Sequence, residues 1–194
     1  SISLSASTGT VGTSVTLTGS GFTASSNYTV YFASIVVLTG TVSGTGTITG
    51  AVFTVPDTTR GTKTVTVTTD GPDTSNTVSF TVTSSVVLSA SGGNVGDVVT
   101  VTGHGFGSSL TASVYFDSTV MTTTTTGTTG VFSTAFTVPA VVVGTHTVKA
   151  SDSGGTSPAV NYVVSPEIAL STTAQAVGSQ ISIIGTGYKA SSSV

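Results

Sequence analysis

Residues 11–22 read VGTSVTLTGSGF, and this pattern returns twice along the chain. Residues 95–106 read VGDVVTVTGHGF, and residues 177–188 read VGSQISIIGTGY. The glycines at positions 12, 96 and 178 recur at intervals of 84 and 82 residues. A fixed period of this size is the signature of tandem modules, each built from a few secondary-structure elements. The 194 residues therefore hold two repeats and part of a third.

Apolar and polar residues alternate through nearly every segment, which is the pattern of strands with one buried face. Turn signals such as Gly19-Ser20-Gly21 separate these segments, and no stretch has a helical period. About seven short strands per repeat predict an all-β fold of two tandem immunoglobulin-like β-sandwiches, over residues 1–84 and 85–166. The predicted inward residues are Val15, Leu17, Val30, Phe32, Phe53, Val55, Val65, Val67, Val78, Phe80 and Val82, with Val99, Val101, Val114, Phe116, Phe136, Val138, Val148, Ala150, Val160, Tyr162 and Val164.

The composition excludes several classes of protein. Charged residues make up 6% of the chain, against roughly 25% in ordinary soluble proteins. A mean hydropathy of +0.45 argues against disorder. A net charge of −3 with four basic residues excludes a nucleic-acid or anionic-membrane footprint. No apolar run is long enough to span a membrane, and no apolar N-terminal helix could build a helical filament core of the type IV pilus kind.

The chain has no cysteine, so disulfides and thiolate metal sites are excluded. Its hydroxyl-rich, charge-poor composition points to the cell exterior. Because acid neutralises carboxylates and removes the ion pairs that need them, a fold with few ion pairs loses little stability at low pH. We therefore expect tolerance of acid.

The order of short motifs resembles the IPT/TIG-type immunoglobulin modules of microbial surface proteins. The resemblance covers both repeats and the start of the third, and it implies the fold rather than a function. It rests on residues 11–22, Val30-Tyr31-Phe32, Phe53-Thr54-Val55-Pro56 and 61–65, and on their counterparts 95–106, Val114-Tyr115-Phe116, Phe136-Thr137-Val138-Pro139 and 144–148.

Residues 167–194 are an incomplete third repeat. Residues 167–171 match the first strand of each repeat, and residues 179–184 match the second. Ile184 stands where the other repeats have Thr18 and Thr102 on the outward face, so this segment is apolar on both sides. Such a strand is typical of a position covered on both sides. Burying one isoleucine is worth roughly 1.5–3 kcal/mol.

A two-strand fragment cannot bury its apolar face alone. It is disordered, cut from a longer protein, or completed by a neighbouring molecule. We predict an extended donor tail, in which Ile181, Ile183 and Ile184 lie on the strand given to the next subunit, with the first repeat as acceptor. Such a head-to-tail contact between copies propagates into a homopolymer.

On this basis the chain is similar to the subunits of archaeal thread filaments. That resemblance implies an extracellular, heavily glycosylated pilus-like fibre that serves adhesion or biofilm formation. The competing hypothesis is a fragment of a larger tandem-immunoglobulin surface protein, an S-layer protein or adhesin, that binds a carbohydrate or protein ligand. Tyr31 and Tyr115, both on outward strand faces, are the aromatic candidates for such binding.

Asn27-Tyr28-Thr29 is the only Asn-x-Ser/Thr sequon of the chain. It follows a serine-rich turn, where a glycan has room. We predict an N-linked glycan on Asn27, the alternative being an unmodified turn asparagine.

We predict no catalytic residue, metal site or cofactor. The two histidines, His104 and His146, are separated across a module, which suits neither a catalytic triad nor a metal centre. His146 occupies the position of Lys63, at the rim of the predicted apolar face. The seven acidic residues are scattered, with no calcium-loop pattern.

Overall fold

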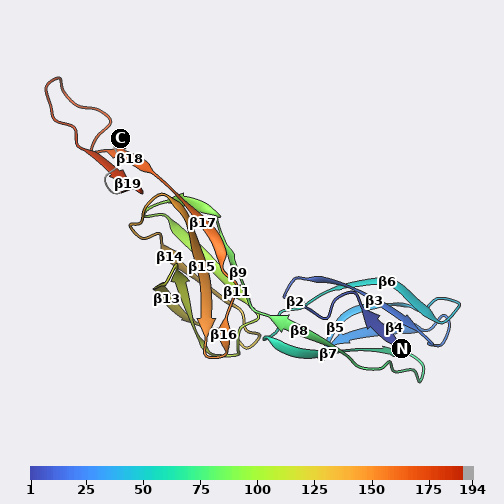
Figure 1. The fold of residues 1–194 in the computed structure, drawn as a ribbon. Helices are drawn as coiled ribbons and strands as arrows, with labels where there is room; N and C mark the ends of the chain where they lie inside the picture. The colour runs from blue at the N-terminus through green and yellow to red at the C-terminus, as the bar shows by residue number, and fades with distance from the viewer. Residues whose placement is uncertain (190–194) are drawn as a thin grey trace. The chain divides into compact units, whose positions relative to one another are not determined.

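The computed structural model describes residues 1–189, and Figure 1 shows the chain as strands joined by loops. The described residues contain no helix, and they form two immunoglobulin-like β-sandwiches and a hairpin, which confirms the predicted fold class. The chain divides into two compact units. The first unit consists of Ser1–Ser85, Gly103–Leu110 and Thr126–Phe132, and the second of Val86–Thr102, Thr111–Thr125 and the described residues from Ser133 onward.

The first sandwich has a three-stranded sheet, in the order β1-β3-β6, and a five-stranded sheet, in the order β2-β8-β7-β4-β5. All pairs are antiparallel except β2 with β8, which are parallel. The N-terminal segment therefore contributes β1 to one sheet and β2 to the other. The strands are β1 (Ile2–Leu4), β2 (Thr8–Thr10), β3 (Ser14–Ser20), β4 (Asn27–Phe32), β5 (Ile35–Thr41), β6 (Thr47–Thr54), β7 (Gly61–Thr69) and β8 (Val78–Thr83).

The second sandwich repeats this plan. One sheet has the order β14-β11-β9, and the other has the order β10-β17-β15-β12-β13 with β16 added beside β15. Here β10 pairs with β17 in parallel, as β2 does with β8. The strands are β9 (Ser85–Leu88), β10 (Gly92–Asn94), β11 (Val98–His104), β12 (Thr111–Phe116), β13 (Thr119–Thr125), β14 (Phe132–Thr137), β15 (Gly144–Asp152), β16 (Gly155–Thr156) and β17 (Val160–Ser165).

Alternating residues of the strands form the core of each sandwich. All predicted inward residues are buried except Val78 and Val160, which are half-buried. Phenylalanines meet edge to face at the centre of the cores, with ring centroids 5.7 Å apart for Phe32 and Phe80. In the second sandwich Phe116 and Tyr162 hold the same relation at 6.1 Å. The alternation of apolar and polar residues stabilises each sandwich because every apolar side chain that it buries contributes roughly 1.5–3 kcal/mol.

The remaining strands are β18 (Glu167–Leu170) and β19 (Ile183–Thr186), which pair antiparallel in a sheet of their own. Residues 190–194 of the predicted tail lie outside the described part of the chain. β8 ends at Thr83 and β17 ends at Ser165, so each repeat meets the next across a junction of a single residue. The domain boundaries at residues 84 and 166 remain predictions.

Candidate functional site

The hairpin of β18 and β19 is the first candidate site. Ile168 stands opposite Gly185 in this hairpin, as Ile2 stands opposite Gly19 in the pair of β1 and β3. The tail is therefore a hairpin and not the extended segment that we expected. The hairpin forms because residues 167–188 have the same strand and turn sequences as the start of the first two repeats.

Hydrogen bonds repeat along the chain with the sequence. The N–H of Ser171 donates to the carbonyl of Ser182, with 2.9 Å between N and O. The Ser171 hydroxyl accepts from the N–H of Ser182 at 3.0 Å. The same two bonds join Ser5 to Thr16 and Ser89 to Thr100. A short stretch of sequence thus encodes this hairpin three times. Within residues 167–189 the third copy forms as a two-stranded sheet.

The hairpin exposes an apolar face that the other repeats bury. Ile168 and Ile183 are 52% and 69% exposed, whereas their counterparts in the first repeat, Ile2 and Leu17, are 6% and 0% exposed. Ile168, Ile183, Gly185 and Tyr188 line one hollow on this face. Water-exposed apolar surface gathered in this way marks an interaction site.

One edge of the hairpin is also open. β3 pairs with β1 and β6, and β11 pairs with β9 and β14, whereas β19 pairs only with β18 among the described residues. An edge with unpaired N–H and C=O groups is a template for another strand. The predicted donor residues lie here: Ile183 and Ile184 are in β19, and Ile181 precedes it outside any strand. Ile181 is 48% and Ile184 60% exposed, and the donation itself remains a prediction.

Asn27, the predicted glycan acceptor, is exposed and opens β4. Its side-chain Nδ2 donates to the Asp70 carboxylate at 3.0 Å, and its backbone N–H donates to the other oxygen of that carboxylate at 3.1 Å. Because an N-glycosylated amide keeps one N–H, the bond to Asp70 does not conflict with a sugar. The glycan remains a prediction.

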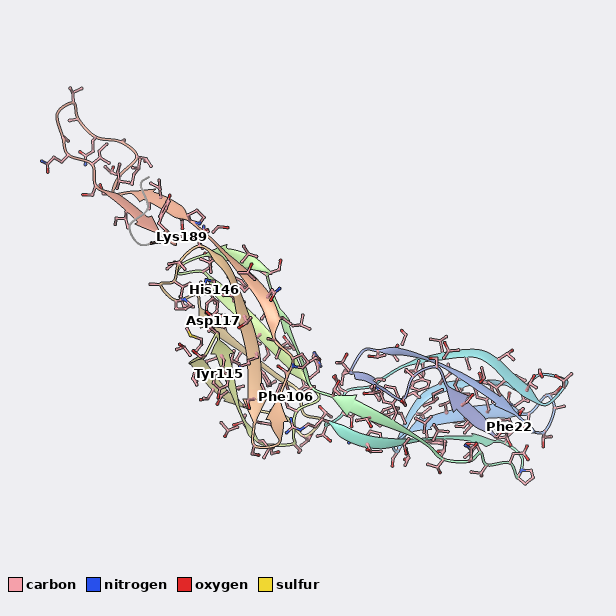
Figure 2. The ribbon with its side chains drawn as sticks, in the orientation of Figure 1. Phe22, Phe106, Tyr115, Asp117, His146 and Lys189 are labelled. Carbon is pink, nitrogen blue, oxygen red and sulfur yellow. The ribbon has the colours of Figure 1, made fainter. Side chains whose placement is uncertain are left out.

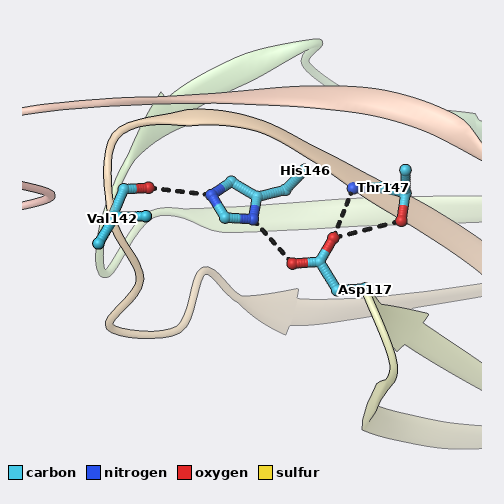
Figure 3. A network of polar contacts seen from close by, with 4 residues as sticks. All are labelled: Asp117, Val142, His146 and Thr147. Atoms are coloured by element: carbon cyan, nitrogen blue, oxygen red, sulfur yellow. Dashed lines mark hydrogen bonds and ion pairs between the residues drawn. The ribbon is translucent and has the colours of Figure 1, made fainter. Parts of the chain in front are cut away.

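His146 forms a polar network that the sequence did not reveal (Figure 3). Its Nδ1 lies 2.8 Å from a carboxylate oxygen of Asp117, and its Nε2 lies 2.9 Å from the carbonyl oxygen of Val142. The other oxygen of Asp117 accepts from the N–H of Thr147 at 2.9 Å and from its hydroxyl at 3.2 Å. The ring stacks on Phe116 with centroids 5.0 Å apart. In Figure 2 Asp117 and His146 lie on the second sandwich.

Both histidines are held by carboxylates. Nδ1 of His104 lies 3.0 Å from Asp57, within the first unit. In His146 both ring nitrogens are engaged, so neither is free to take a proton from a nucleophile. Among residues 1–189 no group of three or more His, Cys, Asp or Glu side chains is placed to hold a metal ion. No helix in that range is long and apolar enough to cross a membrane.

The two candidate aromatics lie on outer sheet faces, both half-buried. Tyr115 pairs across β12 and β13 with Val120, and Tyr31 pairs with Val36 in the same way. The Lys149 ammonium sits 5.7 Å from the centre of the Tyr115 ring, at cation–π distance. One face of the Tyr115 ring is therefore approached by an ammonium, and ligand binding at Tyr31 and Tyr115 remains a prediction.

The comparisons with known proteins bear on the fold. Residues 1–82 match the family model of the IPT/TIG domain. This confirms the resemblance for the first repeat, and the second repeats its pattern. A search of curated proteins found no match.

Three solved structures are similar to the chain. The D0-D1 domain of intimin is 15% identical with a TM-score of 0.32, over 84% of this chain and 97% of that one. A tetra-tandem repeat from the extending region of a large adhesion protein is 19% identical with a TM-score of 0.41, over 88% of this chain but 51% of its own length. Yersinia pseudotuberculosis adhesin InvE is 14% identical with a TM-score of 0.36, over 84% and 58%. At these values the similarities establish neither ligand nor activity.

Proposed function

We propose that this chain is a structural segment of an extracellular surface protein built from tandem immunoglobulin-like modules, of the adhesin or S-layer kind. Its role is mechanical, to hold another part of the protein away from the cell. Residues 167–189 begin a third module of the same type. The observation that carries the proposal is the hairpin of β18 and β19, which repeats the register of β1 and β3 with its apolar face uncovered.

The supporting argument is local. Gly178 and Gly187 have φ of +91° and +75°, close to the +95° and +70° of Gly96 and Gly105. Tyr188 lies over Gly185, as Phe22 lies over Gly19. The tail therefore repeats the two glycine turns of the second repeat and the aromatic contact of the first. The low charge and hydroxyl-rich composition fit an extracellular chain, and we propose a glycan on Asn27 as part of that surface.

A chimeric chain tests this proposal. Residues 107–166 are appended after Tyr188, because Tyr188 aligns with Phe106 and the second repeat then completes the third. We expect three cooperatively folded sandwiches, with amides of β19 protected from exchange as strongly as those of β11. If β19 stays unprotected while the first two sandwiches are folded, the proposal is wrong.

Two substitutions in this chimera serve as a matched pair. Ile183 aligns with the buried Leu17 and Val101, and Ile184 aligns with Thr18 and Thr102 on the outward face. We therefore expect Ile183→Ser to prevent folding of the third sandwich and Ile184→Thr to leave it intact.

The second candidate function is the head-to-tail filament, in which the tail is donated to a neighbouring copy. The open edge of β19 and the exposed Ile184, apolar where the other repeats have threonine, favour it. In that case the native chain forms fibres visible by electron microscopy. Removal of residues 167–194 abolishes them while both sandwiches stay folded, and Ile184→Thr weakens them. Native chain that remains monomeric at high concentration rules the filament out.

A further inference from the structure

The loop between β14 and β15 touches the turn that follows β19, within the second unit. The backbone N–H of Val143 donates to the carbonyl oxygen of Gly187. Ala140, Val141 and Val142 line a cleft together with residues 185–188. Gly187 itself needs to be glycine, since its φ is +75° and a Cβ would lie 2.9 Å from the carbonyl oxygen of Ser165. We refer to this contact between loop 139–143 and residues 185–188 as the joint.

His146 holds Val142, the residue before Val143, whose N–H is the donor at the joint. Its Nε2 bonds the carbonyl of Val142, so the imidazole fixes the peptide unit whose N–H belongs to Val143. A carbonyl oxygen only accepts, and so does the Asp117 carboxylate, which already takes two bonds from Thr147. Both imidazole nitrogens must therefore carry hydrogen to satisfy this geometry. The structure requires the imidazolium form.

The first unit has a matched joint with a different cation. The Lys63 ammonium donates to the Thr59 hydroxyl at 3.0 Å, and the neighbouring N–H of Arg60 donates to the carbonyl of Gly105 at 3.2 Å. Lys63, Thr59 and Arg60 align with His146, Val142 and Val143. Ala33 stands where Asp117 stands, with the same φ of +53°. Each unit thus places a cationic side chain against this loop: an ammonium that bonds a threonine hydroxyl in the first, and an imidazolium that bonds a backbone carbonyl in the second.

We propose that protonated His146 is a pH-sensitive lock on the joint between the second sandwich and the hairpin of β18 and β19. With its proton, His146 bridges Asp117 and Val142, and Val143 presents its N–H to Gly187. Without the second proton, one ring nitrogen becomes an acceptor that faces another acceptor, the Asp117 carboxylate or the Val142 carbonyl. The bridge then opens, and loop 139–143 releases the hairpin. This device works the same way whatever completes the hairpin.

The groups that surround His146 agree with this assignment. Asp117 faces it from the turn between β12 and β13, and Tyr162, its partner across β17, presents a phenol whose pKa is raised by burial and by Asp97. Lys149 of β15 lies on the opposite sheet face, over Tyr115. The hairpin segment adds two further charged residues along the chain, Glu167 at its start and Lys189 after its end, and neither acts on the pKa of His146. Burial acts to lower the pKa of His146, but the hydrogen bonds to Asp117 and Val142 outweigh it and raise the pKa above 6.5.

Hydrogen exchange on the whole chain tests the lock. Amide protection is followed from pH 5.5 to pH 9 for loop 139–143 and residues 183–188, relative to the matched residues 57–60 and 103–106 of the first unit. We expect protection at the second joint to fall about tenfold or more as His146 loses its proton, because a charge-assisted bond is lost. The first joint itself contains the contact of His104 with Asp57, so the comparison is made in a His104→Ser background, which installs the residue of the first repeat at this position. In that background, protection at the first joint stays constant. The NMR titration of His146 should have its midpoint above 6.5.

The double variant Asp117→Ala/His146→Lys is the control, because it installs the residue pair of the first unit. Protection at the second joint should then become independent of pH between 5.5 and 9, since a lysine ammonium does not titrate in the range where histidine does. Protected core amides of β12 and β15 verify that the variant is folded. Protection that falls equally in the variant and the native chain, or a His146 midpoint below 6.5, overturns the proposal.

Discussion

At the scale of single residues, two glycines with positive φ differ in the space around them. Substituting each by alanine therefore distinguishes the cost of backbone strain from the cost of steric overlap. Gly96 has φ of +95° with open space around it, and Gly130 has φ of +76° where a Cβ would lie 2.1 Å from the carbonyl oxygen of Phe106. We expect Gly96→Ala to cost the second sandwich about 1–2 kcal/mol of unfolding free energy, the usual penalty for a left-handed residue. Gly130→Ala should cost about 1–3 kcal/mol more, because the overlap is with backbone that cannot move aside. Denaturant unfolding of both variants measures the difference, and equal costs would contradict this reading.

The site at His146 shows what a sequence leaves hidden at this scale. Asp117 and His146 are 29 residues apart, and they meet because β12 pairs with β15 and Asp117 takes a left-handed φ of +53° at the turn after β12. No periodic pattern encodes that encounter. The available signal was a paired difference between the repeats: Ala33 and Lys63 become Asp117 and His146 together.

At the scale of elements, one side-chain hydroxyl holds the loop before β4 in the first sandwich, and another holds the loop before β12 in the second. In the second sandwich the buried Thr126 hydroxyl donates to the carbonyl of Gly107 at 2.6 Å and accepts from the N–H of Leu110 at 2.9 Å. In the first, Val42 takes the place of Thr126, and Ser26, which aligns with Leu110, donates to the carbonyl of Thr23 at 2.7 Å. We expect Thr126→Val to lower the free energy of unfolding by about 1–3 kcal/mol, because the N–H of Leu110 and the carbonyl of Gly107 lose their hydrogen-bond partner.

The compensating change is the control for this exchange. Leu110→Ser added to Thr126→Val reproduces the arrangement of the first sandwich, and it should recover most of the lost stability. Thermal unfolding of the single and double variants gives the coupling between the two positions. Additive losses would mean that the two sandwiches hold this loop in different ways.

The strands and their buried faces were predicted better from the sequence than the single-residue contacts were. Alternation identified the buried face of β3, β4, β7 and β8 because a strand's side chains point to opposite faces at each step. The sequence could not assign strands to sheets: β1 and β2 lie four residues apart, yet they join different sheets. The pairing register of β18 with β19 followed from the repeat, but the tail was expected to be extended. A repeated sequence predicts a repeated conformation where the hydrogen bonds that fix it lie within the repeated stretch itself. The bond between Ser171 and Ser182 is of this kind.

At the scale of the whole molecule, the scarcity of charge predicts the pH dependence of stability. Hydrogen bonds from the side chain and backbone of Thr23 hold the pKa of Asp73 below 3.8. Burial acts to raise the pKa of Asp117, but hydrogen bonds from His146 and Thr147 outweigh it and lower the pKa. Stability from these carboxylates is present above pH 3.8 and lost as pH falls through their lowered pKa values. The raised pKa of His146 works in the opposite sense, since its contribution is present below pH 6.5 and lost as pH rises past that pKa.

The melting temperature should therefore be nearly level between about pH 4 and pH 6.5 and fall on either side of this window. Calorimetry of the native chain across pH 2–9 measures it. The double variant Asp117→Ala/His146→Lys should lose the alkaline limb, because it lacks the imidazole that bridges Asp117 and Val142. It should keep an acid limb, because Asp73 is unchanged. A melting temperature that drops steeply from neutral pH to pH 4 would mean that carboxylates matter to this fold more than its contacts indicate, and the expected tolerance of acid would then be wrong.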